Sequence, residues 1–419
     1  MISKLGSFYK NVLKLISGTT LAQLIPVLVS PILTRIYSPQ DFGLFALFIT
    51  ISAILNVLST LRYDNVLILP RDNIDGRRVL ILSICVTSFV ALIILLTSYL
   101  FGDYLLISFG YEELMPFKII LAFGVLAAGL YQISDFWLNR KKDYFKMGVL
   151  RVIQSVTIAI LNIGLGLYLI DASGLIYGNV FGFIIASVLG LILLKGDLVK
   201  AINEFSFKDT LKIATQYKDF AVFGTPATLL NVFAQQSFFL FIGYSYGLIA
   251  LGYFYLLNRI IGLPTTIIGS SLGQVFYQRI SQVPINESFP KVRDFALQVI
   301  LQSFFIHILS YFLVDSLLVA IFGDQWSDSL EFLPFFVILL FISFIFGPIS
   351  MLFNYFQLQK QNLIWQILWV VTNIILFFVS ITFNFSITTF LTIFLIKQYL
   401  LYIGGIIFLV FYSLKKKSI

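Results

Sequence analysis

The chain has 419 residues, of which 59% are hydrophobic and only 11% are charged, with a formal net charge of +8. A soluble globular domain carries roughly 25% charged residues, so most of this surface does not face water. The single cysteine, Cys85, and the single histidine, His307, exclude a disulfide framework and a metal centre built from several histidines.

Long apolar segments recur from one end of the chain to the other. Only helices and closed barrels satisfy the backbone in lipid, and barrel strands alternate in polarity. These segments are apolar on all sides and approach or exceed the roughly 20 residues that span a bilayer, which indicates helices. The predicted spans, in chain order, are 15–36, 42–63, 78–101, 115–138, 147–170, 173–194, 217–244, 248–274, 295–322, 331–357, 362–383 and 387–412.

Lysine and arginine are distributed very unevenly over the connections between these spans. All but four of the 28 fall on the side of the N-terminus, beginning with Lys4, Lys10 and Lys14 and ending with Lys415, Lys416 and Lys417. Positive residues mark cytoplasmic connections, so both termini are predicted to be cytoplasmic. The basic charge therefore reports membrane topology and is not taken as a sign of nucleic-acid binding.

Short blocks of sequence repeat in order, roughly half a chain apart. The third span ends in Phe101-Gly102-Asp103 and the ninth in Phe322-Gly323-Asp324, and a proline follows each, at Pro116 and Pro334. Six spans per half make the repeat parallel and place a substrate path between two bundles. The predicted division is an N-terminal six-helix bundle, 1–194, a cytoplasmic linker helix, 195–216, and a C-terminal six-helix bundle, 217–419.

Ionisable residues at membrane depth are functional candidates, and Arg259, Lys397, Asp135 and Asp315 fall within predicted spans, with the outer interface as the alternative position for Asp315. Arg259 lies in the middle of span eight, where insertion of a cation costs about 2.5–3.5 kcal/mol, so it faces an aqueous cavity or belongs to a structural ion pair. Lys397, in the last span, has the alternative of extending its amine to the interface. Asp135, in span four, either pairs with a basic residue or binds a proton or cation.

Polar side chains recur at helical spacing on equivalent spans of the two halves. Asn56 shares a predicted face of span two with Arg62 or Tyr63, Asn231 and Gln235 share a face of span seven, and Asn258 and Gly262 share a face of span eight. Any single stripe is explained by ordinary helix packing through small and polar residues. Stripes on equivalent spans favour a shared hydrophilic vestibule.

The sequence lacks the features of a membrane enzyme. There is no phosphate-binding glycine loop, the outer connections are short, and His307 has no evident catalytic companions. We therefore expect no catalytic activity, no cofactor and no metal.

Several segments resemble one transporter family. They include Leu33-Thr34-Arg35-Ile36-Tyr37-Ser38-Pro39, Leu61-Arg62-Tyr63-Asp64, and Asn258-Arg259 followed by Leu263-Pro264. These blocks resemble the O-antigen and capsule flippases (Wzx-type) of the multidrug/oligosaccharidyl-lipid/polysaccharide exporter superfamily. The resemblance implies an all-α, V-shaped, MATE-like transporter of about twelve helices in the bacterial inner membrane.

The resemblance also implies a cargo and partners. The cargo would be an undecaprenyl-pyrophosphate-linked oligosaccharide, which alternating access moves from the cytoplasmic to the periplasmic leaflet. Membrane lipids surround the transporter, and the polysaccharide polymerase and chain-length proteins are expected partners. The alternative is an ion-coupled exporter of drugs or metabolites, because one fold serves both activities.

The candidate site residues follow from this reading. Arg62 at the inner mouth and Arg259 deeper in the membrane would bind the pyrophosphate through charge-assisted hydrogen bonds, and Arg35 would meet the head group near the outer exit. Asp135 is the candidate for ion coupling. The remaining candidates for substrate binding are Asn56, Asn231, Gln235, Asn258 and Lys397.

Overall fold

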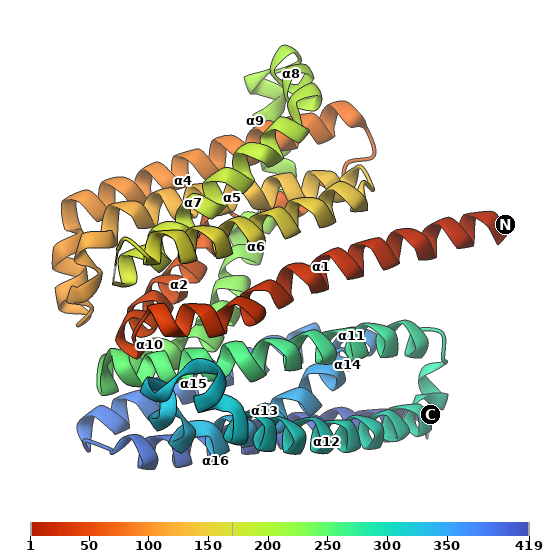
Figure 1. The fold of residues 1–419 in the computed structure, drawn as a ribbon. Coiled ribbons are helices and arrows are strands. Elements are labelled where there is room, and N and C mark those ends of the chain that lie inside the picture. Colours follow the sequence, from red (N-terminus) through yellow and green to blue (C-terminus); the bar gives the residue numbers. More distant parts are fainter. Residues whose placement is uncertain (1, 170, 418–419) are drawn as a thin grey trace. The chain divides into compact units, whose positions relative to one another are not determined.

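The computed structural model describes the backbone of residues 2–169 and 171–417, and the side chains of 18–169 and 171–415. The described chain is built from helices and contains no strand (Figure 1). The charged side chains of Lys4, Lys10, Lys14, Lys416 and Lys417, which entered the topology prediction, lie outside the described residues. The prediction of an all-α membrane fold is confirmed.

Eleven segments of the described chain are long and apolar enough to cross a membrane, and one of them contains two spans. Phe220–Ile280 has 61 residues and as one straight helix would be about 90 Å long, three times the hydrocarbon thickness. Gly247 interrupts it with φ 86° and ψ 171°, a conformation that glycine adopts without steric conflict. This break lies at the predicted connection between spans seven and eight, so the plan of about twelve spans holds.

The first compact unit is Met1–Leu248. Its main packing pairs are α1 with α6, α6 with α7, α5 with α7 and α4 with α5, around a core that includes Leu80, Ile133 and Trp137. Its elements are α1 (Ile2–Ile36), α2 (Pro39–Ser59), α3 (Tyr63–Val66), α4 (Asn73–Ser108), η1 (Glu112–Phe117), α5 (Lys118–Arg140), α6 (Tyr144–Gly166), α7 (Ala172–Leu193), α8 (Lys195–Asn203), α9 (Phe207–Gln216), η2 (Phe220–Gly224) and most of α10 (Thr225–Leu257).

The second compact unit is Ile249–Ile419. Here α13 packs against α11, α12 and α16 around buried Val299, Leu352 and Leu409. Its elements are the end of α10, then η3 (Asn258–Gly262), α11 (Leu263–Ile280), η4 (Ile285–Glu287), α12 (Ser288–Phe322), η5 (Asp324–Phe332), α13 (Leu333–Ser350), α14 (Leu352–Tyr355), α15 (Gln359–Thr382) and α16 (Ile387–Lys417).

The internal repeat appears in the connection between the third and fourth span of each half. A 3₁₀ helix joins α4 to α5 in the first unit, and another joins α12 to α13 in the second. The matching Phe-Gly-Asp blocks differ locally, because Gly102 lies inside α4 whereas Gly323, at φ 103°, ends α12. The repeat therefore preserves the order of elements more closely than the helix ends.

The linker forms two helices, where the sequence predicted one. A break after Asn203 separates α8 from α9, and the Ser206 hydroxyl accepts the Asp209 N–H to cap the second helix. Both helices pack against α4. The first compact unit extends beyond them to Leu248, and the predicted bundle limits at 194 and 217 stay a prediction.

Candidate functional site

The turn after α2 determines how Arg62 is presented. The helix ends at Ser59, and Leu61 and Arg62 both have left-handed backbones, at φ 45° and φ 63°. The predicted helical face that joins Asn56 to Arg62 or Tyr63 is therefore wrong, because helical spacing stops at Ser59, before both residues. Two successive non-glycine residues in this region cost about 1–3 kcal/mol each and persist only where their surroundings hold them.

A buried carboxylate holds this turn. Asp64 has no exposed surface, and its two oxygens accept hydrogen bonds from Thr60 Oγ1 at 2.8 Å and from Gln132 Nε2 at 2.6 Å. The Arg62 N–H also donates to Thr60 Oγ1, at 3.3 Å. Asp64 thus links Thr60, which precedes the turn, to Gln132 of α5. Sequence reasoning missed Thr60 and Gln132 and named Asp64 only within the family-like block.

The side chains around this turn also have defined partners. Asn56 accepts a hydrogen bond from the Ser59 hydroxyl through its side-chain oxygen, at 3.0 Å. Arg62 is half-buried, and with the Asn65 amide turned to accept, the amide oxygen lies 3.0 Å from Arg62 Nε. Arg140 donates to the backbone carbonyls that follow α3, those of Leu67, Pro70 and Asp72, at 2.7–2.9 Å.

Asp135 forms a bidentate ion pair with Arg151. The two Arg151–Asp135 hydrogen bonds measure 2.9 and 2.7 Å, and Arg151 Nη1 also donates to Thr19 Oγ1 at 2.6 Å. The group joins α1, α5 and α6. Pairing with a basic residue was one of the two alternatives for Asp135, and the structure shows that pairing. Its role in ion coupling stays a prediction.

The remaining predicted residues of the first unit lie on α1 and α10. Asn231 and Gln235 share a face of α10, since Gln235 Nε2 donates to Asn231 Oδ1 at 2.7 Å. Arg35 is exposed in the last turn of α1, where the helix dipole favours a cation.

In the second unit, Arg259 lies in a π-helical turn. The Leu263 N–H bonds to the Asn258 carbonyl, five residues back. Proline at 264 explains the wider turn, because its ring conflicts with the carbonyl four residues earlier and it has no N–H to donate. The same arrangement precedes Pro226, where the Thr225 N–H bonds to the Phe220 carbonyl.

This turn also sets the surroundings of Arg259. Its side chain is 7% exposed and donates a hydrogen bond to the Tyr255 hydroxyl, a partner the sequence reading missed. A Cβ on Gly262 would lie 2.3 Å from Asn258 Oδ1, so the Asn258 amide covers this glycine and shares its face, as predicted. The turn thus combines a buried cation and an amide at membrane depth.

Lys397 is held inside the second unit by neighbours on α15 and α16. Its amine donates to Asn373 Oδ1 and lies 4.3 Å from the centre of the Phe394 ring. Asn373 is buried, and an aromatic face attracts a cation most strongly where water is excluded. These contacts compensate the partly buried charge of Lys397 locally. A role in substrate binding stays a prediction.

Among the described residues, no three His, Cys, Asp or Glu side chains form a group that could hold a metal ion.

Comparisons with known proteins agree on family and fold. The family described as "Polysaccharide biosynthesis protein" matches residues 32–331. A comparison with curated proteins by sequence finds no match.

Solved structures of MOP-superfamily transporters share the fold along nearly the whole chain. An inward-facing multidrug resistance MATE family transporter has 15% identity and a TM-score of 0.73, covering 96% of each chain. The lipid II flippase MurJ, inward closed, has 14% identity and a TM-score of 0.70, covering 98% of this chain and 90% of its own. A MOP transporter from Pyrococcus furiosus Vc1 (DSM3638) has 16% identity and a TM-score of 0.59, covering 97% and 96%.

At these identities the structures establish the fold and leave the cargo open. The sequence match extends over more than half of the chain and across both halves of the predicted repeat. The chain therefore belongs to the polysaccharide biosynthesis protein family.

Proposed function

We propose that this protein is a flippase that moves undecaprenyl-pyrophosphate-linked oligosaccharide from the cytoplasmic to the periplasmic leaflet of a bacterial inner membrane by alternating access. The observation that carries the proposal is the family match, which ties a multi-pass membrane protein to polysaccharide biosynthesis. Its fold is shared with a lipid II flippase, which supports a lipid-linked cargo. Both termini would be cytoplasmic, with the polymerase and chain-length proteins as partners.

The chemistry of the cargo suits the cations of the candidate site. A pyrophosphate is a dense anion, and a guanidinium binds it through two parallel hydrogen bonds, which a lysine amine does not reproduce. Buried Arg259 is the first candidate for this contact, with the Asn258 amide available to sugar hydroxyls. Arg62 would receive the head group first and Arg35 would release it.

The coupling step would involve Asp135. A proton or cation that neutralises this carboxylate would weaken its ion pair with Arg151 and loosen the junction of α1, α5 and α6. This gives the ion-coupling proposal a defined structural consequence.

A second candidate is an ion-coupled exporter of drugs or metabolites, which the fold likeness to MATE transporters favours. The two candidates differ in what accumulates when the protein is absent. Loss of a flippase leaves lipid-linked oligosaccharide on the cytoplasmic leaflet, whereas loss of an exporter leaves it unchanged and raises sensitivity to the exported compound.

The test is deletion in the native host, extraction of lipid-linked intermediates, and complementation at matched membrane levels. We expect Arg259→Ala to fail, Arg259→Lys to complement weakly, and Lys360→Ala, an exposed cation in the first turn of α15, to complement fully. Absence of any accumulated intermediate in the deletion strain would overturn the flippase proposal. Normal surface polysaccharide with Arg259→Ala would overturn the role of Arg259 alone.

A further inference from the structure

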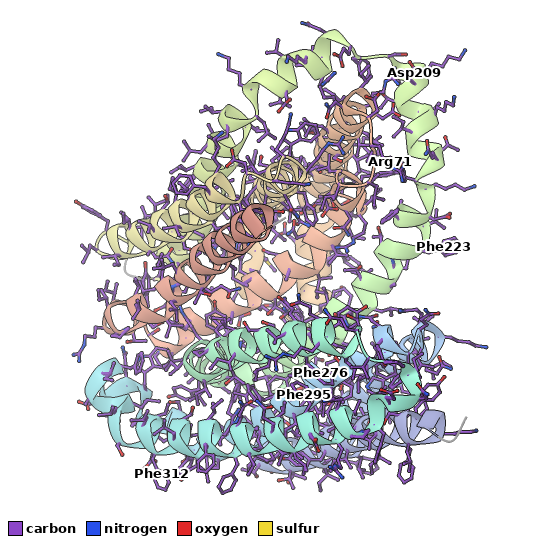
Figure 2. The ribbon with its side chains drawn as sticks, turned by 90° about the vertical axis from the view of Figure 1, so that its right-hand side faces the viewer. Arg71, Asp209, Phe223, Phe276, Phe295 and Phe312 are labelled. Atoms are coloured by element: carbon purple, nitrogen blue, oxygen red, sulfur yellow. The ribbon has the colours of Figure 1, made fainter. Side chains whose placement is uncertain are left out.

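The linker helices have an uneven distribution of charge between their two faces. The linker residues 195–216 contain three acids and four lysines. All three acids are paired with bases of the first unit: Asp197 with Lys141 at 2.9 Å, Glu204 with Arg77 at 2.8 Å and Asp209 with Arg78 at 2.8 Å. Figure 2 shows Asp209 beside the end of α4. The three acids therefore lie on the inner side of the linker, where they bind basic residues of the first unit.

The lysines of the linker face outward and make no ion pair among the described residues. All four are exposed: Lys195, Lys200, Lys208 and Lys212. The ion pairs of the bundle thus leave the outer face of the linker positively charged.

Apolar side chains lie among these lysines on the same outer face. Those exposed by about half or more are Val199 (49%), Ile202 (64%), Phe205 (48%), Phe207 (74%) and Leu211 (57%). The opposite faces of α8 and α9 are already occupied, because Ala201, Thr210 and Ile213 are buried. Exposed apolar side chains flanked by lysines suit the boundary between lipid head groups and acyl chains, because the lysine amines extend back to the head groups.

The ion pairs also fix the depth of the linker. Arg77 and Arg78 immediately precede Val79, where the apolar run of α4 begins. Two residues of helix span about 3 Å, so the backbone of the two arginines that bind the linker lies close to the start of this apolar run. At this depth lipid is the surrounding medium, which favours lipid over a soluble protein as the occupant.

We propose that the outer face of α8 and α9 binds anionic phospholipid head groups of the leaflet on the linker's side. The five apolar side chains would enter the acyl boundary, and the lysines would contact the head-group phosphates. Clusters of lysine beside membrane spans recognise anionic lipid in this way, and raising the salt concentration weakens the contact. The residues of this face are different from those proposed to bind the cargo.

The test uses a fluorescent probe on the linker of the full chain. With Cys85→Ser removing the one native thiol, Leu211→Cys is labelled and the protein is placed in nanodiscs of phosphatidylcholine, with or without phosphatidylglycerol. Brominated acyl chains quench a probe that enters the bilayer. We expect severalfold stronger quenching with phosphatidylglycerol, and loss of that difference in the variant carrying Lys200→Gln, Lys208→Gln and Lys212→Gln.

Matched controls separate this from a general charge effect. Lys291→Gln with Lys360→Gln removes exposed lysines from the first turns of α12 and α15 and should leave the lipid difference intact. A probe at Gln282→Cys, in an exposed connection, should be quenched weakly in both lipids. Equal quenching in the two lipids, or a lipid difference that survives the linker substitutions, would overturn the proposal. A probe that the brominated lipids do not quench in either membrane would also overturn the proposal. It would favour a soluble protein as the partner of this face.

Discussion

Removal of the carboxylate at Asp135 should destabilise the first unit, because it leaves Arg151 without its ion-pair partner. The pair is bidentate, and its side chains are only 15% and 23% exposed. The third Arg151 hydrogen bond, to Thr19, extends the junction to α1. Asp135→Asn keeps the shape of the side chain and removes the charge, so it isolates the electrostatic contribution.

The expected magnitude lies between two measured classes of ion pair. Breaking a buried pair by removing one partner costs about 3–5 kcal/mol, whereas an exposed pair contributes about 0–1 kcal/mol. Because the Asp135 pair is partly exposed, we expect a loss of about 2–3 kcal/mol. In a chain of this length that corresponds to a fall of a few degrees in the unfolding temperature.

The assay is the loss of the folded peak in size-exclusion chromatography after heating in detergent, at one fixed heating time. Asp103→Asn is the matched control, because its pair with Lys118 leaves the Asp103 side chain 57% exposed. The charge swap Asp135→Arg with Arg151→Asp should recover part of the lost stability. Equal thermal loss for Asp135→Asn and Asp103→Asn would refute the reasoning. Unchanged stability combined with lost pH dependence of transport would instead favour ion coupling.

Three further predictions follow from local geometry. A Cβ on Gly43 would lie 1.8 Å from the Leu248 carbonyl oxygen, so Gly43→Ala should sharply lower the yield of folded protein. Gly164→Ala is the control and should leave the yield unchanged, because a Cβ there would meet no atom within 4 Å. Equal yields for the two variants would contradict this packing. Leu61→Gly should raise the free energy of unfolding by about 1 kcal/mol or less, because glycine accepts φ 45° without strain. A lower free energy of unfolding would show that the contacts of the leucine side chain outweigh the backbone strain. Burial raises the pKa of Asp197, but hydrogen bonds from Lys141 and Trp137 outweigh it and hold that pKa below its ordinary value. A carboxyl whose pKa is lowered by folding stabilises the fold at pH values above its unfolded pKa, and this stabilisation is lost as the pH falls through the folded pKa. A probe at Ile202→Cys should therefore report release of α8 only below about pH 4. Asp197→Asn should abolish this pH-dependent release.

The plan of spans could be predicted from the sequence because membrane insertion is a local requirement. Each crossing needs its own apolar segment, since lipid offers no partner to the backbone. This is why the predicted connection between spans seven and eight lies at the break at Gly247. Fixed spacing along one helix also predicted the contact between Asn231 and Gln235, which are four residues apart.

Local backbone geometry limited the same reasoning at the ends of helices. The face that was to join Asn56 to Arg62 assumed a helix through Thr60, and the left-handed residues Leu61 and Arg62 ended that spacing. Their conformation depends on Asp64 and on Gln132, a contact across 68 residues. No pattern within span two contains this information.

The sequence alone determined that this protein crosses the membrane about twelve times, because the required hydrophobic length acts on each segment separately. Only the tertiary structure decided the partners of its charged groups. It paired Asp135 with Arg151, gave Lys397 its contacts with Asn373 and Phe394, and joined Arg78 to Asp209 across 131 residues. Such pairs depend on which helix faces pack together, and the free energy of a buried charge is set by the neighbours that packing supplies.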